Sequence, residues 1–254
     1  MSAFTAWLPA QLFAPLLVFA RLGTAMLLLP GFGEIYVPQR WRLLLALLLA
    51  VLVAPVLSPA LPALPGMPSR LAALLFAEIV IGLFLGSVAR LMLLALEIAG
   101  NIISMQLGLS AAQIFNPLMG QQSALPASML MTLGAMLVFA TDTHHLLLRA
   151  AVDSYGVFPP GMLPPFGELS EAATRIVSAS FRLGLELAAP FVVAGTVFFA
   201  ALGVLSRLVP QLQIFFVTLP VQIVGGLAMF ALTLAAMMGW FVDRFAAAAF
   251  RLVP

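Results

Sequence analysis

The sequence predicts an all-α integral membrane protein with about six apolar helical segments. Its 254 residues are 63% hydrophobic and only 8% charged, whereas soluble domains carry about 25% charged and 45–50% apolar residues. A soluble fold of this size would need many more polar groups to cover its surface. In addition, apolar windows of roughly 17–25 residues, the length that crosses a bilayer as a helix, recur along the chain.

Six windows have this character. They cover residues 12–30, 42–57, 71–97, 124–141, 174–208 and 221–242. The second is short, and the fifth is too long for one perpendicular crossing and is broken by Pro190. The first has no basic stretch before it and no cleavage site after it, so we expect it to remain in the mature chain. Without a fixed-period repeat or a separate soluble part, a single membrane domain over residues 1–254 is the simplest account.

Proline-rich segments separate several of these windows. Two of them are SPALPALPGMP (58–68) and VFPPGMLPPFGELSE (157–171). They should be extended, because each proline removes a backbone donor and biases the residue before it away from helix. A third segment, RLVPQLQIFFVTLP (207–220), is bracketed by Pro210 and Pro220, which predict a tight turn or a helix break.

Charged residues inside the apolar windows are expensive in hydrocarbon, so they indicate either contacts with other helices or a polar path. These residues are Arg21, Glu78, Arg90, Arg182 and Glu186. Arg182 and Glu186 lie four residues apart, so they share a helix face and can pair. A substrate or proton path would need several converging acidic groups, which the sequence lacks. We therefore favour ion pairs that fix neighbouring helices.

Two glycines predict a close helix contact in the third window. Gly82 and Gly86, in EIVIGLFLG, have the small-xxx-small spacing that lets two helix backbones approach each other. This spacing is frequent in glycine-rich membrane chains, so it predicts helix packing and no further role.

The end of the fourth window holds the only cluster of metal-ligating residue types. In TDTHHLLLR, Asp142 precedes the chain's two histidines, His144 and His145. Adjacent helix side chains point about 100° apart and a third nitrogen ligand is missing, so we expect residues that cap a helix and no metal site. The chain has no cysteine, nucleophile elbow, phosphate loop or HExxH motif, and we therefore expect no enzyme and no cofactor.

The segment between the third and fourth windows is unusual. It reads GNIISMQLGLSAAQIFNPLMGQQ (100–122), carries no charge, and holds both asparagines of the chain, Asn101 and Asn116, and four of its nine glutamines. Irregular backbone at membrane depth persists only where it is buried in protein or lines a wet cavity. Neutral amides suit that role, and flexible methionines such as Met105 and Met119 can close an irregular gap. The composition of this segment therefore predicts a re-entrant loop or a plug. The alternative is that the segment is an ordinary polar turn between two helices.

Four stretches carry a resemblance to a known family. They are PGFGEIYVPQRWRLLLALLLAVLVAP, EIVIGLFLGSVARLMLLALEIAGNIISMQLGLSAAQIFNPLMGQQ, LVFATDTHHLLLRAAVDSYGVFPPG and LVPQLQIFFVTLPVQIVGGL. Together and in this order they resemble the FliR family of flagellar biosynthetic proteins, which belong to the type III export gate. The resemblance covers about Arg21 to Gly226. Virulence-secretion relatives match GLSAAQIFNP and HHLLLRA less well, which favours the flagellar branch.

The resemblance implies a component of a protein export channel in the bacterial inner membrane, at the flagellar basal body. One copy would join several copies of FliP and FliQ, with FlhB around the entrance and FlhA as a further partner. Lipid and unfolded export substrates would contact the chain, and nucleic acid would not. The segments would form bent helical hairpins within a larger helical assembly, raised largely out of the bilayer plane, and the charges within them would be subunit contacts.

In that family, the loop after a helix with Glu-x-x-Gly enters the channel as a plug. By matching position, the resemblance assigns the plug or gate to Gly100, Asn101, Met105, Gln106, Gly108, Leu109, Phe115, Asn116, Pro117 and Met119. We assign subunit or helix packing to Arg21, Glu78, Gly82, Gly86, Arg90, Glu97, Arg182, Glu186, Pro210 and Pro220. The chain departs from the family at Asn116, where an aspartate is common, so this plug lacks a charge there.

The main alternative function is a small-molecule transporter. It would use broken helices near Pro190 and between Pro210 and Pro220 to line a site at the membrane midplane. The absence of two repeated halves and the scarcity of converging ionisable groups count against it. An intramembrane enzyme centred on Asp142 and the two histidines would lack a nucleophile or a third ligand.

Overall fold

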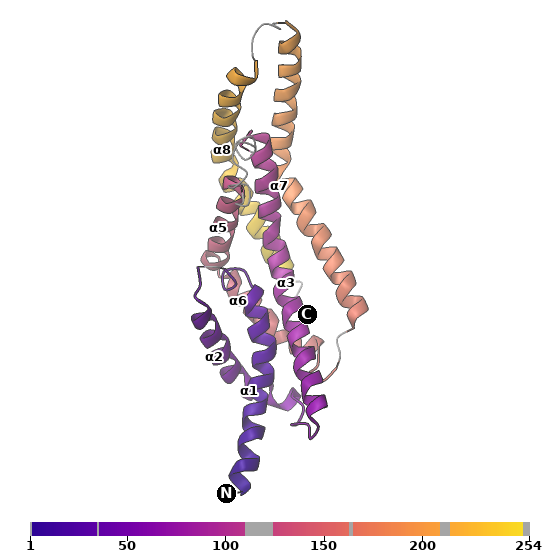
Figure 1. Ribbon diagram of the computed structural model, residues 1–254. Coiled ribbons are helices and arrows are strands. Elements are labelled where there is room, and N and C mark those ends of the chain that lie inside the picture. The colour runs from indigo at the N-terminus through magenta and orange to yellow at the C-terminus, as the bar shows by residue number, and fades with distance from the viewer. Residues whose placement is uncertain (1, 35, 110–123, 163–164, 209–213, 251–254) are drawn as a thin grey trace. The chain divides into compact units, whose positions relative to one another are not determined.

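The computed structural model describes residues 2–34, 36–109, 124–162, 165–208 and 214–250. Every regular element in these ranges is helical, which confirms the all-α prediction (Figure 1). The elements are α1 (Ser2–Leu28), α2 (Gln39–Leu57), the short 3-10 helix η1 (Ser58–Ala60), α3 (Pro68–Gln106), α5 (Leu125–Ala140), α6 (Thr143–Val157), α7 (Phe166–Leu208) and α8 (Ile214–Phe250).

Four stretches of helix are long and apolar enough to cross a membrane, which confirms a membrane protein. They are Gln39–Ala60, Pro68–Gln106, Phe166–Leu208 and Thr218–Ala248. α5 and α6 become a fifth candidate only if they are counted together, and they are bent by 75°. The 16 residues of α5 rise only about 24 Å, less than the roughly 30 Å of a bilayer core. The predicted number of about six segments was therefore approximate.

Three prolines lie inside helices. They are Pro55 in α2, Pro190 in α7 and Pro220 in α8. The prediction that Pro190 breaks the fifth window was wrong, because α7 continues through this proline. The predicted helix break within residues 207–220 is confirmed, because α7 ends at Leu208 and α8 begins at Ile214. α8 itself continues through Pro220. A proline removes one backbone hydrogen bond, and packed neighbours in a membrane protein can compensate for that loss. Pro210 lies outside the described residues.

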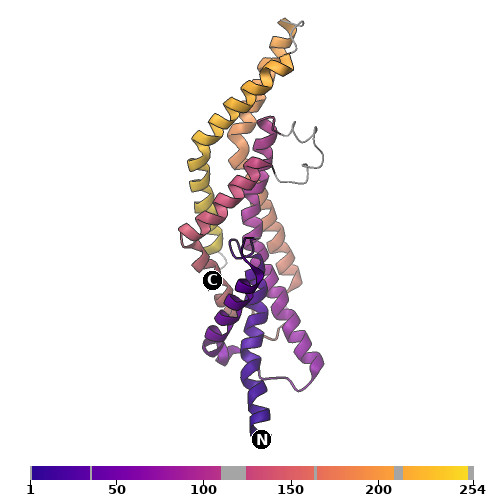
Figure 2. The ribbon, with the colours of Figure 1, turned by 60° about the vertical axis from the view of Figure 1, so that its left-hand side comes forward.

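The chain divides into two compact units. Unit 1 comprises residues 1–92, 138–177 and 245–254, and unit 2 comprises residues 93–137 and 178–244. In unit 1, α1 packs against α2 and α6 (Figure 2). The core of this contact consists of Val18, Leu22, Ala50, Ala54, Ala151 and Tyr155. The alanines of α2 bring its backbone close to α1. A single domain over residues 1–254 stays a prediction.

In unit 2, α3 packs against α5 and α7 through glycines. A Cβ atom at Gly100 would overlap the backbone of Ala127 on α5. A Cβ atom at Gly184 of α7 would lie 2.8 Å from the carbonyl oxygen of Ala95 on α3. Glycine at these two positions therefore allows a helix contact that a larger residue would prevent. Gly100 is thus a packing residue of a helix, although the sequence assigned it to the start of a loop.

Candidate functional site

The predicted plug begins at the C-terminal end of α3. Residues 100–106 are helical, so the irregular part starts later than the sequence predicted. Residues 110–123, which include Phe115, Asn116, Pro117 and Met119 of the predicted plug, lie outside the described residues. The last residues described before them are Gln106, Leu107, Gly108 and Leu109. We call residues 106–109 the stem.

The helix ends in a Schellman motif, which determines the direction in which the stem leaves α3. The backbone N–H of Gly108 donates to the carbonyl of Met105 at 3.2 Å, and that of Leu109 donates to the carbonyl of Ser104 at 3.1 Å. Gly108 has a φ of +75°, the left-handed conformation that this motif requires and that glycine adopts without strain. Two of the carbonyls that lack a partner within the helix are satisfied in this way.

The stem rests on α7 and α8 within unit 2. Gln222 of α8 donates from Nε2 to the carbonyl oxygen of Gln106 at 2.7 Å. Leu107 is 1% exposed, and a Cβ atom at Gly226 of α8 would lie only 2.6 Å from its Cγ. The Gln106 side chain lies directly against Gly195 of α7. Three contacts to two helices therefore determine where the stem lies.

A cavity of about 230 Å³ adjoins these contacts. It is lined by Gln106, Leu107, Phe191, Ala194, Gly195, Phe198, Val221, Gln222, Gly225, Gly226 and Met229. The lining is apolar apart from the two glutamine carboxamides. The remaining helical members of the predicted plug, Asn101 and Met105, point outward, since Asn101 is exposed and Met105 is 65% exposed.

Arg21 and Glu78 form the most deeply buried ion pair among the described residues. Both side chains are fully buried, with Arg21 Nε at 2.6 Å from Glu78 Oε2 and Arg21 Nη2 at 3.1 Å from Glu78 Oε1. The guanidinium also donates to Ser154 Oγ at 3.2 Å and to the Phe158 carbonyl at 2.9 Å. Its carbon lies 3.8 Å from the ring centroid of Tyr155. The pair joins α1 to α3, and the other contacts extend it to α6 and its C-terminal cap.

The other predicted packing residues lie on helix surfaces that face a neighbour or the exterior. Gly82 and Gly86 of α3 lie against α1, where a Cβ atom at Gly86 would come within 2.6 Å of the Ala25 carbonyl oxygen. Arg90 pairs with Glu34, which follows α1. Glu97 is half-buried on α3.

Arg182 and Glu186 pair along α7, as the sequence predicted from their spacing. Arg182 Nε lies 2.7 Å from Glu186 Oε1, while the Arg182 side chain is 81% exposed. This ion pair lies on the surface of an apolar helix, and its arginine is exposed.

Sequence reasoning missed several partners of these residues. They are Glu34, Ser154, Tyr155 and Gln222. Gln222 had a recognisable signal, because it is a polar residue inside an apolar window. Glu34, Ser154 and Tyr155 had no such signal, because they lie outside the apolar windows.

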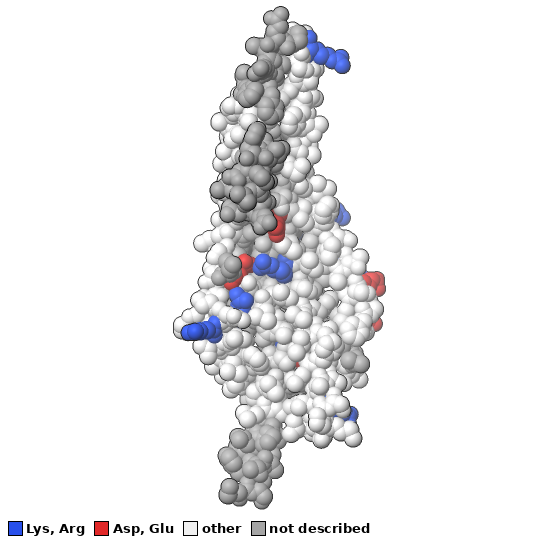
Figure 3. Space-filling view, viewed as in Figure 1, with Lys and Arg blue, Asp and Glu red and all other residues white. Residues whose placement is uncertain are grey.

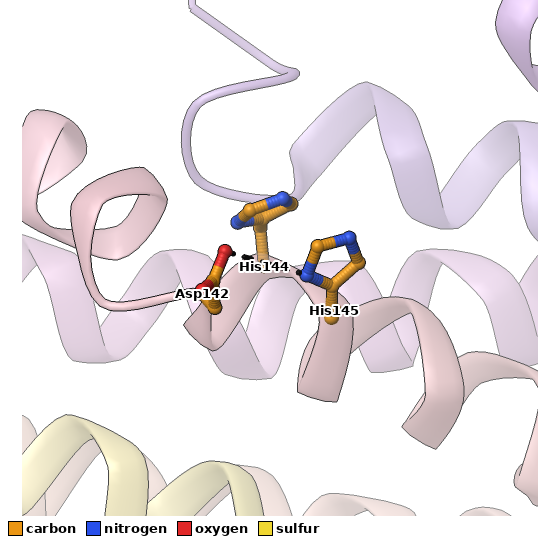
Figure 4. A group of neighbouring side chains, drawn as sticks. All are labelled: Asp142, His144 and His145. Carbon is orange, nitrogen blue, oxygen red and sulfur yellow. Dashed lines mark ion pairs between the residues drawn. The ribbon is translucent and has the colours of Figure 1, made fainter.

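Asp142, His144 and His145 are the described residues that could hold a metal ion. One ligand atom from each lies within 4.8 Å of the others (Figure 4), closer than adjacent helix positions led us to expect. Asp142 occupies the N-cap position of α6, but its side chain makes no capping hydrogen bond. Its Oδ1 lies 3.6 Å from His145 Nδ1. The predicted capping role of this side chain was therefore wrong.

The two imidazole rings lie close together and are tilted against each other. Their centroids are 4.0 Å apart and their planes are 35° from parallel. The expectation of no metal site stays a prediction.

Comparison with known proteins gives a family for the chain. Residues 12–248 match the model of the family described as Bacterial export proteins, family 1. The chain is 41% identical to the flagellar biosynthetic protein FliR of Caulobacter vibrioides over 92% of this chain and 94% of the relative. It is 32% identical to FliR of Bacillus subtilis over 82% of this chain and 81% of the relative, and 32% identical to FliR of Escherichia coli over 89% and 84%.

These matches extend from the first apolar helix almost to the end of α8 and cover more than four-fifths of each relative. The chain therefore belongs to this family of bacterial export proteins and is a relative of FliR.

Proposed function

We propose that this chain is a component of the flagellar type III protein export gate in the inner membrane. It helps to form and close the channel through which unfolded flagellar subunits are secreted. The observation that carries this proposal is family membership over residues 12–248, together with 41% identity to a flagellar biosynthetic protein. Membership also supports a structural export component rather than an enzyme.

The closing element of the proposed gate is the segment that follows the stem. The Schellman motif at Gly108 directs the chain out of α3, and the contacts to α7 and α8 hold that exit in place. The segment from 100 to 122 carries no charge, so it would close the channel by packing methionine, leucine and phenylalanine. Such a seal is independent of ion pairing and can yield to the varied side chains of an unfolded substrate.

The surface of the chain supports assembly with other subunits. Large apolar side chains are exposed on α7 and α8, among them Leu208 at 73%, Val224 at 69% and Leu232 at 84%. Charged side chains are few on the face shown in Figure 3. Exposed apolar area on this scale requires lipid or protein partners. The proposed partners are several copies of FliP and FliQ around one copy of this chain, with FlhB and FlhA beside them.

Conductance of the assembled complex tests the plug. The chain is co-expressed with FliP and FliQ, and native mass spectrometry establishes that the complex has formed. Deletion of residues 106–119 should make membranes that contain the complex leak small ions. A second variant keeps the chain length and the stem by replacing residues 110–119 with glycine and serine. It should leak as well, because its loop lacks the apolar side chains of the seal.

Background conductance from both variants, in complexes that still assemble, would refute the plug. The mass measurement also separates the main alternative function. A chain that stays monomeric or forms a symmetric homo-oligomer in the presence of FliP and FliQ would favour a small-molecule transporter over an export gate.

A further inference from the structure

We propose that the stem and its seat on α8 form a latch, and that Gln222 is the positioning residue that keeps the latch closed. The seat consists of Gln222 and Gly226 on α8 and Gly195 on α7. The inference rests on the proposed plug, because it states how the segment after the stem is held. In the closed position Gln222 binds the end of α3, and the stem leaves the seat when the channel opens.

The first contact of the latch is a hydrogen bond to the end of a helix. The Schellman motif satisfies the carbonyls of Ser104 and Met105, and the N–H of Leu107 satisfies that of Ile103 at 2.9 Å. The carbonyl of Gln106 follows these in the chain, and Gln222 supplies its donor at 2.7 Å. A side chain of α8 therefore completes the cap of α3 at the position where the stem begins.

The second contact is apolar and depends on glycine. Leu107 is buried against Gly226, where an added Cβ atom would lie 2.6 Å from the leucine Cγ. Gly195 makes the same kind of room for the Gln106 side chain. Because Cβ atoms are absent at both positions, the stem lies directly on the backbones of α7 and α8. The seat is thus shaped for these two side chains.

The adjoining cavity makes release of the stem feasible. This pocket of about 230 Å³ is open on one side and is lined by Gln106 and Leu107 themselves. The two stem side chains therefore border open space, into which they can move when they leave the seat. Release breaks one side-chain hydrogen bond and the contacts of Leu107 with Gly226 and of the Gln106 side chain with Gly195.

Glutamine has the properties that this position needs. Its carboxamide donates to a carbonyl and carries no charge, so it suits an apolar helix. Glutamate has the same length, but as a carboxylate it can only accept a hydrogen bond and would repel the Gln106 carbonyl. Leucine has a similar size and offers no donor. Gln222→Glu and Gln222→Leu therefore test the donor with little change in volume.

The first experiment measures leak conductance of the assembled complex. Gln222→Leu should raise the open fraction about fivefold, the effect of losing a hydrogen bond of ordinary net strength, and Gln222→Glu should raise it at least as much. Gln39→Leu, at an exposed position on α2, is the matched control and should conduct like the wild type. If both Gln222 variants assemble and stay at the wild-type level, Gln222 does not hold the latch.

The second experiment locks the stem covalently. The chain has no cysteine, so Leu107→Cys with Gly226→Cys introduces one defined pair. A Cβ atom at Gly226 lies 3.5 Å from the Leu107 Cβ, within the range of disulfides. Oxidation should form the disulfide and abolish substrate export, and reduction should restore it. Each single-cysteine variant, treated identically, should export to the same extent before and after oxidation, because it cannot form the disulfide.

The outcomes separate this proposal from the proposed plug. If the disulfide forms and the oxidised complex still exports, the stem does not leave its seat and the latch is refuted, whatever the deletion of residues 106–119 does. If the disulfide does not form, the closed seat itself is refuted. If the deletion fails to leak but oxidation still blocks export, the latch controls export by another route and the plug is refuted.

Discussion

Replacing Glu78 with glutamine should strongly destabilise the chain, because it leaves Arg21 buried without a counter-charge. Both side chains are fully buried and joined by hydrogen bonds of 2.6 and 3.1 Å. Removing one partner of a buried ion pair costs about 3–5 kcal/mol of unfolding free energy. For a chain of this length, 1 kcal/mol corresponds to about 2–4 °C in melting temperature. The expected decrease is therefore about 6–20 °C.

The measurement is thermal unfolding of the purified complex in a mild detergent, followed by loss of the helical circular dichroism signal. Glu171→Gln is the matched control. Glu171 pairs with Arg175 at 3.7 Å, but these side chains are 69% and 71% exposed. Such a pair contributes only about 0–1 kcal/mol. The control should therefore lower the melting temperature by at most about 4 °C.

A double variant separates charge from packing. Arg21→Met combined with Glu78→Leu removes both charges and keeps apolar volume, so it should recover much of the stability that Glu78→Gln loses. The reasoning is refuted if Glu78→Gln has the same melting temperature as the Glu171→Gln control. It is also refuted if the double variant is less stable than Glu78→Gln, because the loss would then not arise from an uncompensated charge.

Three further outcomes are expected. Gly86→Ala should lower the melting temperature, since overpacking a close helix contact costs about 1–3 kcal/mol. Gly203→Ala is the control and should be neutral or stabilising, because its Cβ atom would meet nothing within 4 Å. Equal melting temperatures of the two variants would contradict the contact of Gly86 with α1. Asp142 has a φ of +56°, a left-handed conformation that glycine adopts without strain. Asp142→Gly should therefore have a free energy of unfolding about 1–2 kcal/mol higher than Asp142→Ala and should melt at a higher temperature. The reverse order would exclude backbone strain at residue 142. Arg182→Gln should leave the melting temperature of the isolated chain nearly unchanged, because the Arg182 side chain is 81% exposed. The variant should, however, reduce the amounts of FliP and FliQ that copurify with the chain. Unchanged amounts would exclude a subunit contact at the ion pair of Arg182 and Glu186.

The positions of the apolar helices could be predicted because apolarity and window length are local properties of the chain, whereas α6 (Thr143–Val157) lies in none of the six windows. Their ends and interruptions were less predictable. Pro190 and Pro220 are local signals for a break, yet both lie inside continuous helices. Likewise, the polar composition of residues 100–106 indicated a loop, whereas α3 continues to Gln106. At the end of α3, packing of Gly100 against α5 and of Leu107 against α8 outweighs the preference of the local sequence. Pro190 and Pro220 are exposed, and each costs its helix one backbone hydrogen bond without ending it.

The candidate site was predictable as a region but not as a set of contacts. The uncharged segment around Gln106 attracted attention by composition alone. Its partner Gln222 lies 116 residues away in the chain, and no pattern in one sequence relates the two.

By itself, the sequence determined that this protein is helical and that it belongs in a membrane. These properties follow from composition and from the spacing of apolar residues. Only the tertiary structure decided that Arg21 binds Glu78, that Gly86 contacts α1, and that the stem rests on α8. Such contacts depend on which helices become neighbours, and that choice is made by close packing among segments distant along the chain.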